Sequence, residues 1–369
     1  MVGALFKLGR GAMLSWIREF WFYRHLFGAG NIKGALKDYF LYFFSRYDRK
    51  TSLLSLNFLI TSRCNLKCSI CSFGGNLNSG DNGISIGDFE KFISGLRVKN
   101  KPVLFFSGGE PFAREDIFDI LKIAKRYGFK CGVNTNGTLL DKDKIDRLAG
   151  LGIELLIFSV YGPQHIHDAL TSVKGSYART LEAVRLACAK KNNKGRVILS
   201  CTITREGLDA LETIPLVGKS LGVSAVKLEH LNFMSPAELS KDHPHTLLTD
   251  AYRTADGFSD KLIEKLAALR RKYGSFVMVK PGLSNREIKS WYSEKFYTGR
   301  RCFFPWHSVF IRPDGVAVPC QFLLDYELGD IKKQSPEEIF HNNRMLSLRM
   351  ALRRGSLPGC SRHFRCCKL

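Results

Sequence analysis

The stretch Arg63-Cys64-Asn65-Leu66-Lys67-Cys68-Ser69-Ile70-Cys71 places three cysteines at C-x3-C-x2-C spacing, directly after the apolar run Leu53 to Ile60. In fully ligated [4Fe–4S] sites each of the four irons takes one thiolate. Since no fourth cysteine lies close to this triplet, one iron would keep an open coordination position. An open iron can bind a reactant, so the stretch predicts a reactive cluster. The alternative is a zinc site, which normally takes four protein ligands.

From residue 51 onward, apolar runs typical of strands alternate with amphipathic runs typical of helices. We expect strands at Leu53–Ile60, Val103–Ser107, Lys130–Thr135, Leu155–Val160, Val197–Ile203 and Val223–Leu231. Helices are expected near Ser85–Leu96, Glu115–Tyr127, Asp141–Leu148, Tyr177–Lys190 and Leu208–Ser220. This alternation predicts an α/β fold in which a parallel sheet is joined by crossover helices. In parallel α/β folds of this kind the catalytic residues gather at the carboxyl ends of the strands. The cysteine triplet follows the first expected strand, as this rule predicts.

The cysteine triplet resembles the C-x3-C-x-Φ-C signature of the radical S-adenosylmethionine (radical SAM) enzymes, with the non-aromatic Ile70 at the Φ position. The resemblance implies a partial (β/α)6 TIM-like barrel over residues 51–232. It also implies that Cys64, Cys68 and Cys71 ligate a [4Fe–4S] cluster whose open iron binds S-adenosylmethionine. Reductive cleavage of that molecule yields a 5′-deoxyadenosyl radical, which abstracts a hydrogen atom from the substrate. A reduced flavodoxin or ferredoxin-type protein is the electron donor that this chemistry implies.

Three strand ends carry further motifs of the family. Gly108-Gly109-Glu110 resembles the Gly-Gly-Glu motif that contacts the amino group of S-adenosylmethionine. Asn134-Thr135-Asn136-Gly137 is similar to a Thr-Asn-Gly element near the cofactor, although Asn-Gly also suits a turn. Ser159 matches a position that contacts the ribose or carboxylate of the cofactor, whereas Tyr161 replaces a common Asp. The resemblance therefore implies cofactor-binding roles for Gly108, Gly109, Glu110, Asn134, Asn136 and Ser159.

The carboxyl-terminal residues 301–369 form a second, small cysteine-rich region. It resembles the SPASM and Twitch auxiliary-cluster domains and contains Cys302, Cys320, Cys360, Cys366 and Cys367. These are fewer cysteines than a full SPASM domain needs for two clusters. The resemblance implies one auxiliary [4Fe–4S] cluster, bound by Cys302, Cys320, Cys360 and either Cys366 or Cys367. A structural zinc ion in the same sulfurs is the alternative.

Residues 1–50 have helical periodicity and a crowded set of aromatic side chains with Lys and Arg on the flanks. Such a segment suits an amphipathic helix that lies on an anionic membrane surface, or a helix that covers the end of the barrel. The formal net charge of +22 also favours an anionic partner. A lipid, isoprenoid or other membrane-held substrate is therefore our first expectation, and a peptide is the second. A non-catalytic nucleic-acid-binding protein is supported by the charge alone.

The 11 cysteines cluster at metal-ligand spacings rather than as a disulfide framework, and we find neither a signal peptide nor an apolar stretch of spanning length. We therefore expect a cytoplasmic protein, peripheral at the inner membrane face. Residues 233–300 are expected to form a helical linker region. At the end of the sixth expected strand, Glu229 or His230 is a candidate to touch substrate, and Cys201 is a candidate hydrogen-atom donor.

Overall fold

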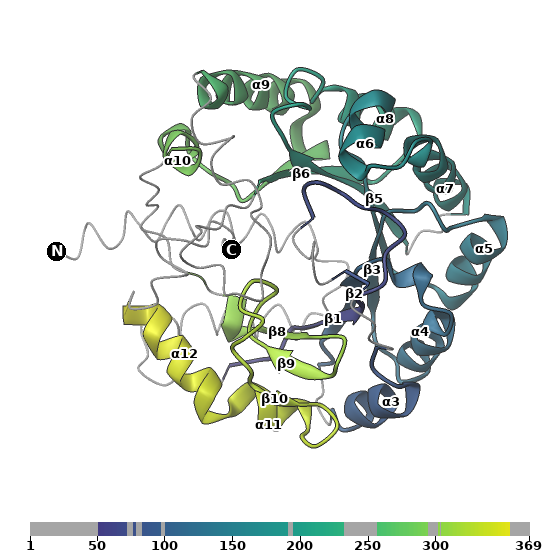
Figure 1. Ribbon diagram of the computed structural model, residues 1–369, viewed down its shortest axis with the longest axis vertical. Helices are drawn as coiled ribbons and strands as arrows, with labels where there is room; N and C mark the ends of the chain where they lie inside the picture. Colours follow the sequence, from purple (N-terminus) through teal and green to yellow (C-terminus); the bar gives the residue numbers. More distant parts are fainter. Residues whose placement is uncertain are drawn as a thin grey trace.

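The computed structural model describes residues 51–71, 77–78, 83–96, 100–190, 195–231, 257–293, 302 and 304–354. Within them, one curved sheet of ten strands runs in the order β10-β9-β8-β1-β2-β3-β4-β5-β6-β7 (Figure 1). The strands are β1 (Ser55–Thr61), β2 (Val103–Gly108), β3 (Cys131–Thr135), β4 (Leu155–Ser159), β5 (Arg196–Ile203), β6 (Ala225–His230), β7 (Val277–Lys280), β8 (Ser308–Ile311), β9 (Val316–Val318) and β10 (Gly329–Asp330). Strands β1 to β7 pair in parallel with their neighbours.

Helices cover the outer face of this curved sheet (Figure 1). They are α3 (Ile86–Ser94), α4 (Ile117–Arg126), α5 (Lys142–Leu151), α6 (Gln164–Thr171), α7 (Ser176–Lys190), α8 (Thr213–Ser220), α9 (Phe258–Tyr273), α10 (Asn285–Trp291), α11 (Pro336–His341) and α12 (Asn343–Arg354). Several begin at a side-chain cap, as where the hydroxyl of Ser85 accepts a hydrogen bond from the amide of Asp88. The predicted partial barrel is therefore confirmed.

Alternate strand residues divide between two cores. The residues that face outward, such as Leu56, Phe58 and Phe106, pack with helix side chains in the large core. The inward residues of the first half of β2, β4 and β5 form a small separate cluster of Val103, Phe105, Leu155, Ile157 and Ile198. We call this cluster the apolar plug. It fills the barrel interior near the amino ends of these strands.

Beyond the plug, toward the carboxyl ends of the strands, the described residues leave the interior open. Asn134 is exposed although it lies within β3, and it occupies the inward register position beside Ile157 of the plug. The side chain of Glu229, also inward on β6, is 40% exposed. Inward strand residues can reach solvent only where no other side chain fills the barrel. This open half of the interior lies at the carboxyl ends of the strands, which is also where the cysteine triplet follows β1.

Four of the ten strands, β7 to β10, were not among those predicted from the sequence. Residues 233–300, expected to be a helical linker, contain β7 as well as α9 and α10, and β7 extends the parallel sheet beside β6. On the other side, β8 pairs in parallel with β1, so the cysteine-rich region continues the barrel sheet. The predicted domain boundaries themselves stay predictions. The expected helical extension over residues 1–50 lies outside the described residues.

Candidate functional site

The segment from residue 62 to residue 71, here called the cysteine loop, is tied to two neighbouring elements. At its start, the amide of Gly109 donates to the carbonyl of Thr61 at 2.8 Å, and that of Glu110 donates to Arg63 at 2.7 Å. Farther along, the amides of Lys67 and Ser69 donate to the end of α6, at 3.1 and 2.8 Å. The loop is therefore held between the end of β2 and the end of α6.

The three thiols of this loop are partly exposed and close enough to affect one another. Burial, and then the like charge of neighbouring groups including Cys71, raise the pKa of Cys64 to about 11 and that of Cys68 to about 12. Bare thiolates are thus disfavoured here, and bound cations would offset both effects. Soft sulfur donors of this kind suit an iron–sulfur cluster. The three cysteines therefore fit the [4Fe–4S] cluster that the sequence predicts.

Within the part of the chain that the structure describes, no group of three His, Cys, Asp or Glu side chains converges on a position for a single metal ion. In a [4Fe–4S] cube each thiolate binds a different iron, so its ligands need not converge in this way. Ile70, at the position that is usually aromatic in the family, packs partly buried against the main core.

The glycine pair Gly108-Gly109, at the end of β2, permits a close approach of two backbones. Gly108 has φ of +120°, a conformation that favours glycine. A Cβ atom on Gly109 would lie 2.1 Å from the carbonyl oxygen of Arg63. These glycines therefore let the end of β2 lie directly against the cysteine loop. Their predicted contact with S-adenosylmethionine stays a prediction.

Glu110 is a buried carboxyl group that joins two strand ends. It accepts hydrogen bonds from the hydroxyl of Thr135 at 2.7 Å and from the amides of Asn136 and Phe112 at 2.7 and 3.2 Å. Burial nevertheless raises the pKa of Glu110 to about 7, although these bonds oppose the rise. The group thus fastens β2 to β3 next to the cysteine loop, and its predicted contact with the cofactor amino group stays a prediction.

This shift predicts a pH-dependent stability for the chain without iron. Between pH 4.5 and about 7 the unfolded chain has released the proton of Glu110 while the folded chain still holds it. The free energy of unfolding should therefore fall as the pH rises through this window, by up to about 3 kcal/mol, and stay level above it. Urea unfolding across this range measures the slope. The slope should be lost in Glu110→Gln and retained in the exposed control Glu115→Gln, and equal slopes in both variants contradict the assignment.

The end of β3 is bonded to the cysteine loop through side chains. The amide of Asn136 donates to Asn65 at 3.0 Å, and Asn65 donates to the hydroxyl of Thr138 at 2.7 Å. Asn136 thus helps to hold the loop, and Asn134 and Ser159 lie at inward positions beside the open interior. The predicted contacts of these three residues with the cofactor stay predictions. Asn65 was not predicted from the sequence, because only the fold brings it to β3.

Tyr161, which replaces the Asp common in the family, lies against the cysteine loop. Burial, and then the proximity of Cys68, raise its pKa above the usual range. Its ring stacks on that of His167 at 5.5 Å between centroids. The neighbouring Asp168 accepts hydrogen bonds from the amides of Gly175 and Tyr177, at 2.7 and 2.9 Å. The His167–Asp168 pair is thus structural, and it supports the start of α7.

Two candidate residues on β5 and β6 face outward, away from the open interior. Cys201 lies in the main core and is 1% exposed, and burial raises the pKa of its thiol to about 12. His230 is also buried, and its Nδ1 lies 2.9 Å from the hydroxyl of Tyr292, the residue that follows α10. The expectation that Cys201 donates a hydrogen atom is therefore wrong on geometric grounds. Of the pair at the end of β6, Glu229 is the residue that faces inward.

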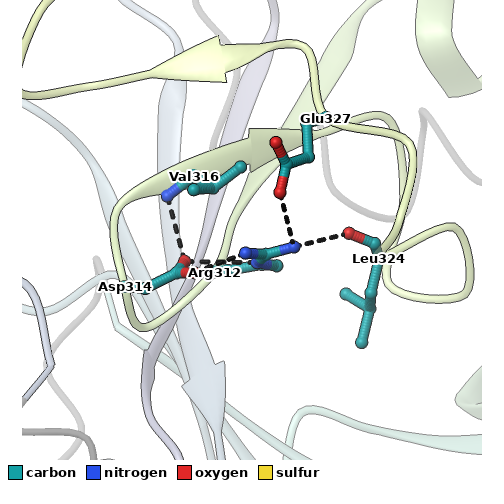
Figure 2. A network of polar contacts seen from close by, with 5 residues as sticks. All are labelled: Arg312, Asp314, Val316, Leu324 and Glu327. Atoms are coloured by element: carbon teal, nitrogen blue, oxygen red, sulfur yellow. Dashed lines mark hydrogen bonds and ion pairs between the residues drawn. The ribbon is translucent and has the colours of Figure 1, made fainter. Parts of the chain in front are cut away.

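Of the predicted auxiliary ligands, Cys302 and Cys320 are described, and both are buried. Cys320 follows β9, and the loop after it is held by Arg312 (Figure 2). The guanidinium of Arg312 pairs with Asp314 and donates to the carbonyl of Leu324 at 2.8 Å. Cys360, Cys366 and Cys367 lie outside the described residues.

Comparison with known proteins agrees with this geometry. A model of the radical SAM superfamily matches residues 58–214, and a model of the SPASM iron–sulfur cluster-binding domain matches residues 302–367. The chain belongs to the radical SAM superfamily. More narrowly, it is a radical SAM enzyme with a carboxyl-terminal SPASM iron–sulfur domain. Its cofactors are the [4Fe–4S] cluster with S-adenosylmethionine and the auxiliary iron–sulfur centre of the SPASM domain.

Several relatives have described activities. An AdoMet-dependent heme synthase of Methanosarcina barkeri is 23% identical over 288 residues, which are 77% of this chain and 80% of that protein. A pre-heme d1 synthase of Dinoroseobacter shibae is 30% identical over 215 residues, 54% of this chain and about half (51%) of that protein. The crystal structure of Streptococcus suis SuiB bound to S-adenosylmethionine has a TM-score of 0.62 at 14% identity, and covers 81% of this chain and 68% of that one. This last likeness supports the fold alone.

No helix in the described residues is long and apolar enough to span a membrane.

Proposed function

We propose that this enzyme abstracts a hydrogen atom from a substrate that binds in the open half of the barrel. The observation that carries the proposal is the position of the cysteine loop, which follows β1 at the same edge as the exposed, inward Asn134. When bound, the reduced cluster supplies the electron that splits S-adenosylmethionine into methionine and the 5′-deoxyadenosyl radical. The chain places the reactants: Gly109 and Asn136 fix the cysteine loop, and the apolar plug closes the opposite end of the interior.

A membrane-held lipid or isoprenoid is the substrate class we propose first, with a reduced flavodoxin or ferredoxin-type protein as electron donor. The support is the aromatic and basic sequence of residues 1–50 together with the net charge of +22. The enzyme would then act at the anionic inner face of the membrane. Binding to anionic liposomes tests this class. If the full chain does not bind, and activity is unchanged after removal of residues 1–50, the membrane proposal is wrong.

Tetrapyrroles and peptides are two other candidate substrate classes. Two relatives are named as a heme synthase and a pre-heme d1 synthase, and heme is a tetrapyrrole. SuiB, whose likeness to this chain extends to the fold alone, has also been crystallised with its precursor peptide SuiA. A peptide substrate stays the alternative that the sequence suggests. Both classes share with fatty acids the possession of carboxylate groups.

Anaerobic reconstitution of the full chain tests the proposed reaction. We expect dithionite-reduced enzyme to convert S-adenosylmethionine into 5′-deoxyadenosine. We also expect about eight irons per chain for two cubes, whereas about four would indicate one. Reconstituted enzyme that holds iron but forms no 5′-deoxyadenosine would contradict hydrogen abstraction.

A further inference from the structure

A group of charged side chains lies inside the barrel, on the wall opposite β1 and β2. On β6, Lys227 and Glu229 occupy alternate positions on the same side as Ala225, which pairs with Ile198 of the plug. The ammonium of Lys227 lies 3.1 Å from Oε2 of Glu229. The hydroxyl of Ser200 on β5 donates to the same oxygen at 2.6 Å. These groups therefore form one polar layer above the apolar plug.

The neighbouring strand adds a second lysine to this layer. Lys280 is the last residue of β7 and is the register partner of Glu229. Its neighbour Val279 belongs to the outer core, so Lys280 takes the inward position of the strand. Among the described residues that face the interior in this layer, two lysines thus stand beside one carboxylate.

The layer borders the open half of the interior. The side chain of Glu229 is 40% exposed, whereas that of Lys227 is only 12% exposed. The layer therefore meets solvent at Glu229 and is largely shielded from it at Lys227. Burial lowers the pKa of Lys280 well below its usual value, and an anion bound beside it would favour the charged form again. A partly desolvated ammonium binds a carboxylate more strongly than an ammonium in open water does.

We infer that Lys227 and Lys280, held in place by Glu229 and Ser200, bind a carboxylate group of the substrate. Such a contact would fix one end of the substrate against β6 and β7 while the cysteine loop lies across the barrel at the end of β1. The inference rests on the proposed function, and it adds the chemical class of the group that is recognised. A fatty acid and a porphyrin that bears propionates share this chemistry.

Equilibrium binding to the unreduced, iron-loaded full chain tests the inference. The probes are oleate and coproporphyrin III, each compared with its methyl ester. For at least one of the two acids, we expect Lys280→Met and Lys227→Met each to raise the Kd about tenfold, equivalent to about 1.4 kcal/mol. The ester should bind wild type and variants equally. Lys280→Arg, which keeps the charge, should retain most of the affinity.

Lys142→Met is the matched control, because Lys142 lies on the outer helix α5 with 69% of its side chain exposed. Iron content shows that each variant is folded and loaded. The inference is overturned if neither acid binds wild type, if the esters bind as tightly as the acids, or if the inward variants behave like Lys142→Met. Because binding is measured without reduction, a failure to form 5′-deoxyadenosine would count against the proposed reaction and leave this result intact.

Discussion

Replacing Cys68 with alanine is expected to lower the rate of S-adenosylmethionine cleavage by at least about a thousandfold, or about 4 kcal/mol in the activation free energy. Cys68 lies in the middle of the cysteine loop, and its thiol is close to those of Cys64 and Cys71. Loss of one of only three sulfurs would leave two irons of the cube without a protein ligand. The cube is then expected to bind weakly or to lose iron. Production of 5′-deoxyadenosine and the iron content per chain measure the two effects.

Cys188→Ala is the matched control for this variant. Cys188 is also partly exposed, but it lies in α7 on the outer face of the barrel. It should keep full iron content and full cleavage. If the Cys68→Ala enzyme retained both as well, Cys68 would not be a cluster ligand and the assignment of the whole triplet would have to be revised.

Strands β1 to β6 were predictable because each is a short apolar run with turn residues near its ends. The second strand was expected at Val103–Ser107 and is found at Val103–Gly108. Strand β7 was not predicted, because Val277–Lys280 is only four residues long and follows a long helix. Its assignment depends on pairing with β6, which a single sequence does not show.

The site divides in the same way. The cysteine triplet and Gly108-Gly109-Glu110 could be found from the sequence, since the residues of each motif lie close together in the chain. The contact between Asn65 and Asn136, and the layer that contains Lys227 and Lys280, could not. Which face of a strand points inward depends on register, and a shift by one residue reverses it. The same reversal explains why Cys201 was a reasonable candidate in the sequence and is excluded in the fold.

Substituting alanine for Gly109 should destabilise the chain by about 3 kcal/mol and also reduce its iron content. The new Cβ would lie 2.1 Å from the carbonyl oxygen of Arg63 and 2.9 Å from that of Ser62. Both atoms belong to the backbone, so no side-chain rotation can relieve the overlap. The end of β2 and the start of the cysteine loop must separate, which breaks the bonds from Gly109 to Thr61 and from Glu110 to Arg63. Urea unfolding and iron analysis measure the two consequences.

Gly150→Ala is the matched control, because the same substitution should stabilise the chain at this position. Gly150 lies within α5, and a Cβ there would meet no other atom within 4 Å. Alanine should stabilise that helix by about 0.5–1 kcal/mol and leave the iron content unchanged. A Gly109→Ala chain as stable as wild type and fully loaded with iron would show that β2 and the cysteine loop can move apart without loss. The cluster position would then have to be fixed by the contacts of the loop with α6 and with Asn136 instead.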